Sequence, residues 1–314
     1  MRQFIFTLCL CFVVLSSFAQ KTNPADPPKK NNKSGVKKDS LVKKTPPFLF
    51  KNTADSLAFI EHAYLGIPSQ ALPDTAQRKD FLLIKKQYVL SYNQANNCAN
   101  WVSWHLSQEW VGEAERSDKF VPDTTLPRKW YKATPNDYRN TGFDRGHICP
   151  SADRTSSEED NNATFLMTNI FPQAPNNNQR TWKYLEDYAR RLVDEGNELY
   201  ITAGVYGKGG VDKLAKLDTL IGTKSKIVVP EKVWKVIVVL PDKDTGIDFE
   251  RIDENTRVIA VLMPNTQDLL TDWTQYRTTV DDIEALTGYD FFKALPPAIE
   301  EALEKKIDAV VLKK

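Results

Sequence analysis

Histidine and cysteine are scarce in this chain of 314 residues, which contains three histidines and four cysteines. Two of the cysteines fall within the first twenty residues, so only Cys98 and Cys149 remain in the rest of the chain. Two thiols allow one disulfide at most, and the sequence does not give the distance between them. A Cys98–Cys149 disulfide and two separate buried thiols are therefore both open at this stage.

Long apolar runs are also lacking, with one exception at the N-terminus. Residues 4–18 are mostly apolar, follow a short basic start and end in a small-x-small pattern at Ala19. This arrangement is typical of a secretory signal peptide, and the run is short for a membrane anchor. We therefore expect residues 1–19 to be removed and the mature protein, without a membrane span, to be exported to the periplasm or the medium. Export would place the chain in a compartment where disulfides are permitted.

A large net charge is absent, because the whole chain carries a formal charge of +1. The charges are nevertheless unevenly distributed: residues 21–51 contain nine lysines and two aspartates, a net charge of +7. From residue 20 onwards the chain has 41 basic and 41 acidic residues, so the part after residue 51 carries about −7. We expect residues 20–51, rich in lysine, proline and asparagine, to be a disordered linker. A polyanion bound by the acidic body must then be held by a local basic patch.

The rest of the chain mixes helical and strand patterns without a regular β-α-β alternation. Runs rich in β-branched and aromatic residues predict strands, and apolar residues spaced three and four apart predict helices. This mixture favours an α+β fold with a largely antiparallel central sheet flanked by helices. The predicted strands are 81–93, 100–107, 165–173, 198–207, 226–240 and 257–265. The predicted helices are 55–65, which is followed by a Gly-Ile-Pro turn, 178–197, 278–292 and 297–314.

Polar residues that suit phosphodiester chemistry gather in the middle of the chain. A histidine beside an arginine can act as a general base near an anion, and arginines bind phosphate in a bidentate manner. Asparagine and glutamate offer hard oxygen ligands, which favour Mg²⁺ over zinc. At 100° per residue, the last two members of the set lie within roughly 80° of each other on one helix. The set is Arg116, Arg145, His147, Asn169, Asn178 and Glu186.

Each of these residues also has a purely structural interpretation. Asn178 could be only the N-cap of its helix, where asparagine is favoured. Glu186 could lie on a solvated face and pair with Arg190 four residues later. Arg145 could be a structural ion-pair partner, and a single histidine is more often packed than reactive. The order and spacing of the whole set favour the functional interpretation.

The motifs around these residues resemble a known family. DRGH at 144–147 is followed by Asn-x-x-Pro-Gln and then by Asn-x-x-x-Trp-x-x-Leu-Glu, which ends at Glu186. This order is similar to the DNA/RNA non-specific endonucleases, a group of ββα-metal (His-Me finger) nucleases that includes secreted bacterial nucleases and mitochondrial endonuclease G. The resemblance extends over residues 64–295, and we place the endonuclease domain at 52–296, followed by a C-terminal helix at 297–314.

The resemblance implies a role for each residue of the set. His147 would be the general base that deprotonates water, and Asn178 would hold a single Mg²⁺, for which Mn²⁺ could substitute. Glu186 would orient the metal-bound waters, and Asn169 would help to hold the site. Arg116 and Arg145 would lie near the scissile phosphate.

The implied activity is secreted, Mg²⁺-dependent hydrolysis of both DNA and RNA, bound through their phosphates, with little sequence preference and with 5′-phosphate ends. Two other hypotheses stay open. The first is a catalytically idle nucleic-acid or surface binding module on the same fold. The second is a cysteine hydrolase that pairs Cys149 with His147, two residues apart on one strand face.

Overall fold

The computed structural model describes residues 50–222, 226–242 and 248–311. The predicted signal peptide and nearly all of the predicted linker lie outside these residues. The central element is a seven-stranded sheet in the order β1-β2-β3-β6-β11-β12-β13, in which all neighbouring strands are antiparallel. Its strands are β1 (Phe81–Ile84), β2 (Val89–Asn93), β3 (Cys98–Leu106), β6 (Asn197–Tyr206), β11 (Lys232–Pro241), β12 (Arg257–Pro264) and β13 (Arg277–Thr278). The predicted α+β class with a largely antiparallel sheet is confirmed.

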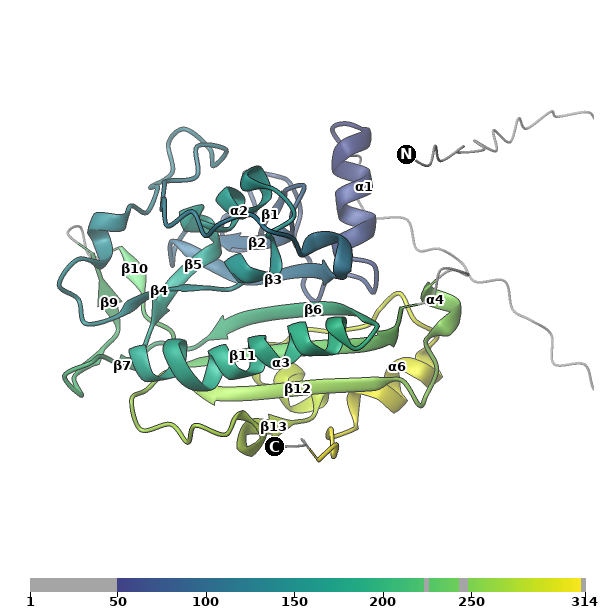
Figure 1. The fold of residues 1–314 in the computed structure, drawn as a ribbon. Helices are drawn as coiled ribbons and strands as arrows, with labels where there is room; N and C mark the ends of the chain where they lie inside the picture. Colours follow the sequence, from purple (N-terminus) through teal and green to yellow (C-terminus); the bar gives the residue numbers. More distant parts are fainter. Residues whose placement is uncertain (1–49, 223–225, 243–247, 312–314) are drawn as a thin grey trace, which may run out of the picture. The chain divides into compact units, whose positions relative to one another are not determined.

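Helices cover both faces of this sheet, as the alternation of side chains along β11 shows. Val233 and Ile237 belong to the cluster that also contains apolar side chains of α3 (Lys183–Asp194), while Trp234 and Val236 belong to the opposite cluster. Figure 1 shows α3 crossing in front of the central strands. The opposite cluster receives side chains from α1 (Thr53–His62), α5 (Val280–Thr287) and α6 (Pro297–Glu304).

The remaining elements are short. Two further helices are α2 (Glu158–Thr164) and α4 (Asp248–Arg251), and three two-stranded pairs stand apart from the main sheet. Those pairs are formed by β4 (Asp144–His147) with β5 (Ile170–Gln173), β7 (Gly210–Val211) with β8 (Leu217–Asp218), and β9 (Leu220–Ile221) with β10 (Ile227–Val228). None of the helices in the described part of the chain is long and apolar enough to cross a membrane.

The pair β4–β5 leads directly into the helix that carries the second half of the polar set. The strand predicted at 165–173 begins only at Ile170, because residues 167–169 form a 3₁₀ turn before it. After β5 a π-helical segment, Asn177–Trp182, precedes α3. The chain therefore forms two antiparallel strands followed by a helix, which is the ββα arrangement that the resemblance implies.

The predicted C-terminal helix is wrong beyond Glu304, where α6 ends. Ile307 and Val310, which were expected on its apolar stripe, are 57% and 43% exposed. The segment instead bends back toward the sheet, because the buried carboxylate of Asp308 binds Arg257 at 2.8 Å and Arg277 at 3.0 Å. The segment after α6 is therefore held to the sheet by ion pairs of Asp308 and not by an apolar helix face.

Both cysteines are free thiols with fully buried side chains, so no Cys98–Cys149 disulfide forms in the described part of the chain. Cys98 opens β3 in the main sheet, whereas Cys149 follows the separate strand β4. Burial raises the pKa of each thiol to about 12. A neutral, enclosed thiol is a poor nucleophile, so the structure does not favour the cysteine-hydrolase hypothesis.

Candidate active site

His147 lies at the end of β4, opposite Ile170 on β5. A clamp formed by Asn169 fixes the chain just beyond it. The side chain of Asn169 accepts a hydrogen bond from the Cys149 amide at 2.9 Å and donates to the carbonyls of Cys149, at 2.8 Å, and Thr164, at 2.9 Å. Asn169 is fully buried, so its place is within the scaffold that holds the histidine strand rather than at the substrate.

The glycine of the DRGH motif is required by a close approach between the two strands. A Cβ atom on Gly146 would lie 2.1 Å from Oε1 and 2.7 Å from Cβ of Gln173, far inside van der Waals contact. Gln173 is itself held in place, because its amide nitrogen donates to Asn177 Oδ1 at 2.7 Å. Close packing against Gln173 therefore requires glycine at position 146, independently of the chemistry of the neighbouring residues.

His147 is 9% exposed, and its ring packs against two phenylalanines, which also contact each other. Its centroid is 4.7 Å from that of Phe165, edge to face, and 5.4 Å from that of Phe120. Within the described part of the chain, the buried Nε2 atom has no hydrogen-bond partner. Burial and the charges of Arg116 and Arg145 lower the pKa of His147 to about 3. The imidazole is therefore neutral at pH 7 and has a free nitrogen.

The same two phenylalanines position the two predicted arginines. The guanidinium of Arg145 lies 4.1 Å from the ring centroid of Phe120, and that of Arg116 lies 5.0 Å from that of Phe165. Arg116 also donates from Nε to Asp118 at 2.7 Å. Neither phenylalanine was predicted to belong to the site. The only sequence signal is that Phe120 lies in the segment 116–123, one of those that resemble the family.

Asn178 lies in the π-helical segment, and its orientation depends on Asp144, the first residue of the DRGH motif. Its Nδ2 atom donates to Asp144 Oδ2 at 2.8 Å, and Gln179 donates to the same oxygen at 2.8 Å. This bond directs the amide nitrogen toward Asp144 and leaves Oδ1, which accepts no hydrogen bond from the described residues, available as a ligand. Asn178 is not the N-cap, since that position is Asn176.

Both arginines and Asn178 line one open cleft of about 470 Å³. His147 is not itself a lining residue, but Phe120, which contacts its ring, is. The structure thus places Arg145, Arg116 and Asn178 around one cleft whose lining has a net positive charge, with His147 in contact with one lining residue. The lining residues are Arg116, Asp118, Phe120, Pro135, Asn136, Tyr138, Arg139, Phe143, Asp144, Arg145 and Asn178.

Glu186 lies half-buried on α3, and it does not form the ion pair with Arg190 that the structural interpretation predicts. Its carboxylate lies 3.6 Å from Nζ of Lys235, which is 1% exposed. Lys235 follows the β11 alternation onto the face under α3 and lies 4.3 Å from the ring centroid of Trp182. Arg190 instead binds Asp153 at 2.8 Å.

Burial raises the pKa of Glu186 to about 7, against the opposing effects of Lys235 and Arg190. No contact within the described residues joins Glu186 to Asn178 or to His147. The π-helical segment between Asn178 and α3 rotates less per residue than an α-helix, so the 80° computed for a regular helix does not apply. The structure places Glu186 on α3, which continues the π-helical segment of Asn178, and pairs it with Lys235.

Comparison with known proteins decides the family. A sequence model described as DNA/RNA non-specific endonuclease matches residues 70–298. The chain belongs to this family. The endonuclease is 49% identical over 247 residues to a nuclease of Nostoc sp. (strain PCC 7120 / SAG 25.82 / UTEX 2576), with 79% of this chain and 86% of the relative covered.

More distant relatives agree. A mitochondrial nuclease EXOG of Danio rerio is 33% identical over 71% of this chain and 63% of its own length. A solved structure of an EndoG/EndoGI complex superposes with a TM-score of 0.61 at 24% identity, over 76% of this chain and 93% of the other, and shows a shared fold. The protein is therefore an enzyme that hydrolyses nucleic acid, and its substrates are DNA and RNA. Enzymes of this family are in general metal-dependent.

Proposed function

We propose that the endonuclease is exported and cleaves the P–O3′ bond of DNA and RNA with His147 as general base and a Mg²⁺ ion bound by Asn178, leaving 5′-phosphate and 3′-hydroxyl ends. The observation that carries this proposal is the state of His147: its ring is neutral, and its Nε2 atom is buried without a hydrogen-bond partner among the described residues. The charges of Arg116 and Arg145 act on this ring, and both arginines line the same cleft as Asn178. Each part of the site has one task in this reaction.

The first task is removal of a proton from the attacking water. Nε2 of His147 can accept it, since this nitrogen makes no bond to the described residues. A base whose pKa is about 3 is weak in the free enzyme. The phosphate of the substrate offsets the charges of Arg116 and Arg145, so the basicity of His147 should rise when substrate binds.

The second task is to hold the phosphate. Arg145 and Arg116 present guanidinium groups that can bind its non-bridging oxygens, and packing against phenylalanine rings restricts their motion. The local positive charge at the cleft is of the kind that the acidic body after residue 51 needs in order to hold a polyanion. The same groups stabilise negative charge that develops in the transition state.

The third task is charge neutralisation at the leaving oxygen. Asn178 Oδ1 is a hard, neutral oxygen at the cleft, fixed by Asp144, and such a ligand fits Mg²⁺ or Mn²⁺. Asn178 would hold the ion there, and a bound Mg²⁺ would supply Lewis-acid stabilisation of the leaving 3′ oxygen. For Glu186 we propose the role that the family resemblance implies, the orientation of waters around the ion, from its position on the same helix as Asn178.

Export is proposed from the N-terminal sequence alone. The apolar run before Ala19 supports removal of residues 1–19, and the lysine-rich segment after it supports a spacer at 20–51. Mass spectrometry of the protein recovered from the periplasm and from the medium of the producing cells tests this. A mature N-terminus at residue 20 is expected, and an intact Met1 in the cytoplasm would contradict it.

A cleavage assay tests the chemistry. Supercoiled plasmid and a structured RNA are incubated with the enzyme in Mg²⁺, in Mn²⁺ and in EDTA, and the product ends are identified by their susceptibility to phosphatase and ligase. We expect cleavage of both substrates with either metal, none in EDTA, and 5′-phosphate ends. Inactivity on both substrates would favour the idle binding module.

The His147→Ala variant tests the base. We expect it to bind substrate and to melt as a folded protein, but to lose at least 10²-fold in kcat, with partial recovery when imidazole is added. His105→Gln is the matched control. His105, on β3, is another largely buried histidine, and its Nε2 atom lies 3.1 Å from a carboxylate oxygen of Glu198. Full activity of His147→Ala would exclude the histidine base.

A further inference from the structure

The cleft contains a third arginine that has no part in the reaction proposed above. Arg139 lines it together with Arg116 and Arg145, and Arg139 is exposed. Arg116 forms an ion pair with Asp118 at the same cleft, whereas Arg139 has no ion pair or side-chain hydrogen bond with any of the described residues. A guanidinium group without a carboxylate partner, at a cleft that receives a polyanion, is available to bind phosphate.

Arg139 lies farther from the proposed base than the other two arginines. Arg145 and Arg116 each pack on a phenylalanine ring that also contacts the ring of His147. Their charges lower the pKa of His147, and the charge of Arg139 is not among the causes. The first two arginines are therefore placed for the scissile phosphate, and Arg139 is placed for a group farther along the cleft.

The backbone that leads to Arg139 is attached to the strands that carry the base. Residues Pro135–Tyr138 form a 3₁₀ turn immediately before it. The hydroxyl oxygen of the buried Tyr138 lies 3.5 Å from the carbonyl oxygen of Ile170, and Ile170 is paired with His147 in the β4–β5 ladder. The backbone of Arg139 therefore keeps its position relative to the base, and only its side chain has to become ordered on a ligand.

The size of the cleft leaves room for a second phosphate. Its volume is about 470 Å³, which is enough for a whole small ligand and not only for one phosphate group. We propose that Arg139 binds a phosphate next to the scissile one in the same strand, so that the cleft holds two neighbouring phosphates of the substrate. This inference rests on the proposed use of the cleft as the place where the nucleic acid binds.

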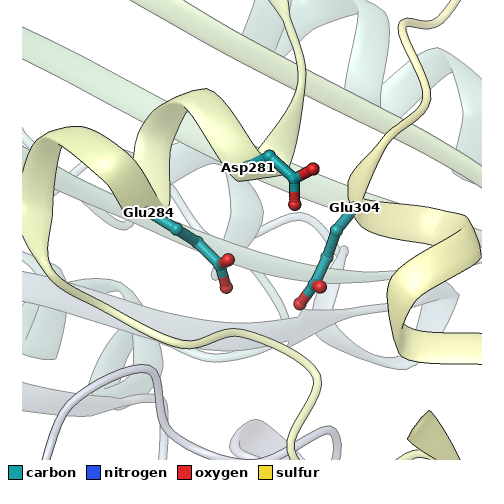
Figure 2. A group of neighbouring side chains, drawn as sticks. All are labelled: Asp281, Glu284 and Glu304. Atoms are coloured by element: carbon teal, nitrogen blue, oxygen red, sulfur yellow. The ribbon is translucent and has the colours of Figure 1, made fainter.

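On the opposite side of the sheet, acidic side chains repel such a strand. Figure 2 shows the carboxylates of Asp281, Glu284 and Glu304 gathered between α5 and α6, and one oxygen from each lies within 4.8 Å of the others. These helices pack on the face of the sheet opposite α3. Lys305, the residue after α6, is exposed and pairs with Glu301 at 2.5 Å. It offers a positive charge outside the cleft for a control variant.

Binding of a short, fluorescently labelled single-stranded DNA, followed by anisotropy in EDTA, tests the role of Arg139 without cleavage. The Arg139→Gln variant should weaken binding about tenfold, the lower end of what a hydrogen bond to a charged group contributes. It should also reduce the slope of log K against log salt concentration by about 0.7, because one phosphate contact is lost. Arg139→Lys should restore the slope but not the full affinity, since lysine keeps the charge without the bidentate geometry. Lys305→Gln, the matched control, should bind as the wild type does.

Cleavage of two substrates in Mg²⁺ tests which phosphate Arg139 contacts. The first substrate is the same oligonucleotide, and the second is bis(p-nitrophenyl) phosphate, which contains a single phosphodiester. Arg139→Gln should raise the KM for the oligonucleotide about tenfold with kcat close to that of the wild type, and it should leave hydrolysis of the small diester unchanged. Arg145→Gln should impair both reactions, because the phosphate that it contacts is the scissile one.

Three results would overturn the inference. One is wild-type affinity and salt slope in Arg139→Gln. Another is an equal loss of activity on both substrates, which would place Arg139 at the scissile phosphate. The third is a fall in melting temperature that accompanies weaker binding in Arg139→Gln and Arg139→Lys alike, which would indicate a structural role. If the wild type binds the oligonucleotide but cleaves neither substrate, the proposed function fails, and the binding measurements still decide the role of Arg139.

Discussion

Replacing Asp144 with alanine should weaken metal binding more than it weakens substrate binding. In the wild-type enzyme, Asp144 Oδ2 accepts hydrogen bonds from Asn178 Nδ2 and Gln179 Nε2, both at 2.8 Å. The first of these bonds decides which end of the Asn178 amide faces the cleft. Without it the amide can rotate and present a hydrogen-bond donor to the ion.

The size of the effect follows from the charge on the acceptor. A hydrogen bond to a charged group contributes about 1.5–3 kcal/mol, and loss of such a supporting contact typically reduces metal affinity by about 10- to 100-fold. Asp144 is half-buried, so we expect the lower part of that range. Removal of its negative charge beside Arg145 should leave the KM for nucleic acid unchanged or lower it.

The assay is a titration of activity with Mg²⁺ at saturating substrate, together with direct Mn²⁺ binding followed by electron paramagnetic resonance. Gln179→Ala is the matched control, because it removes a bond to the same oxygen atom and leaves the bond to Asn178. The reasoning is refuted if Asp144→Ala binds Mn²⁺ with wild-type affinity. It is also refuted if KM and metal affinity deteriorate together with a fall in melting temperature, which would indicate a general structural role.

Three further predictions concern the hairpin and the thiols. The acid limb of the pH profile of kcat/KM should lie well below pH 6.5, because burial and the arginines lower the pKa of His147 to about 3. The Arg145→Gln variant removes one positive charge and should shift this limb to higher pH. A limb at pH 6.5 in both enzymes would argue against this. Asn169→Ala should lower the free energy of unfolding in urea by about 3 kcal/mol, because it leaves buried backbone groups without partners, and a loss below about 1 kcal/mol would contradict the clamp. Site-resolved alkylation should leave Cys98 and Cys149 unmodified in the native protein and modify both after unfolding without reductant, whereas resistance after unfolding would indicate a disulfide.

Local pattern was enough to predict the sheet and the main helix. The β-branched run from Lys232 to Pro241 forms β11, and apolar residues spaced three and four apart, such as Leu185 and Leu192, form the buried face of α3. The C-terminal helix was extended too far because its apolar stripe continues in sequence. Its end is decided by ion pairs of Asp308 with arginines on distant strands, and no local pattern contains that information.

The candidate site was predicted only in part, for a similar reason. The motifs identified His147 and Asn178; the structure places Asn178 in the cleft and His147 against Phe120, which lines it. The aromatic rings that pack against the histidine, Phe120 and Phe165, come from segments separate from its own strand, and their role depends on tertiary packing. Lys235 was not predicted beside Glu186 because a lysine within an apolar strand is expected to avoid the core.

The bond between Asp144 and Asn178 also determines when the enzyme becomes active. One partner is on the histidine strand and the other precedes α3, so the proposed base and the proposed metal ligand are held in a fixed relation only after these segments have packed together. A nascent or unfolded chain holds every reactive side chain but cannot cut. Synthesis of the chain and the onset of the proposed activity are therefore separate events.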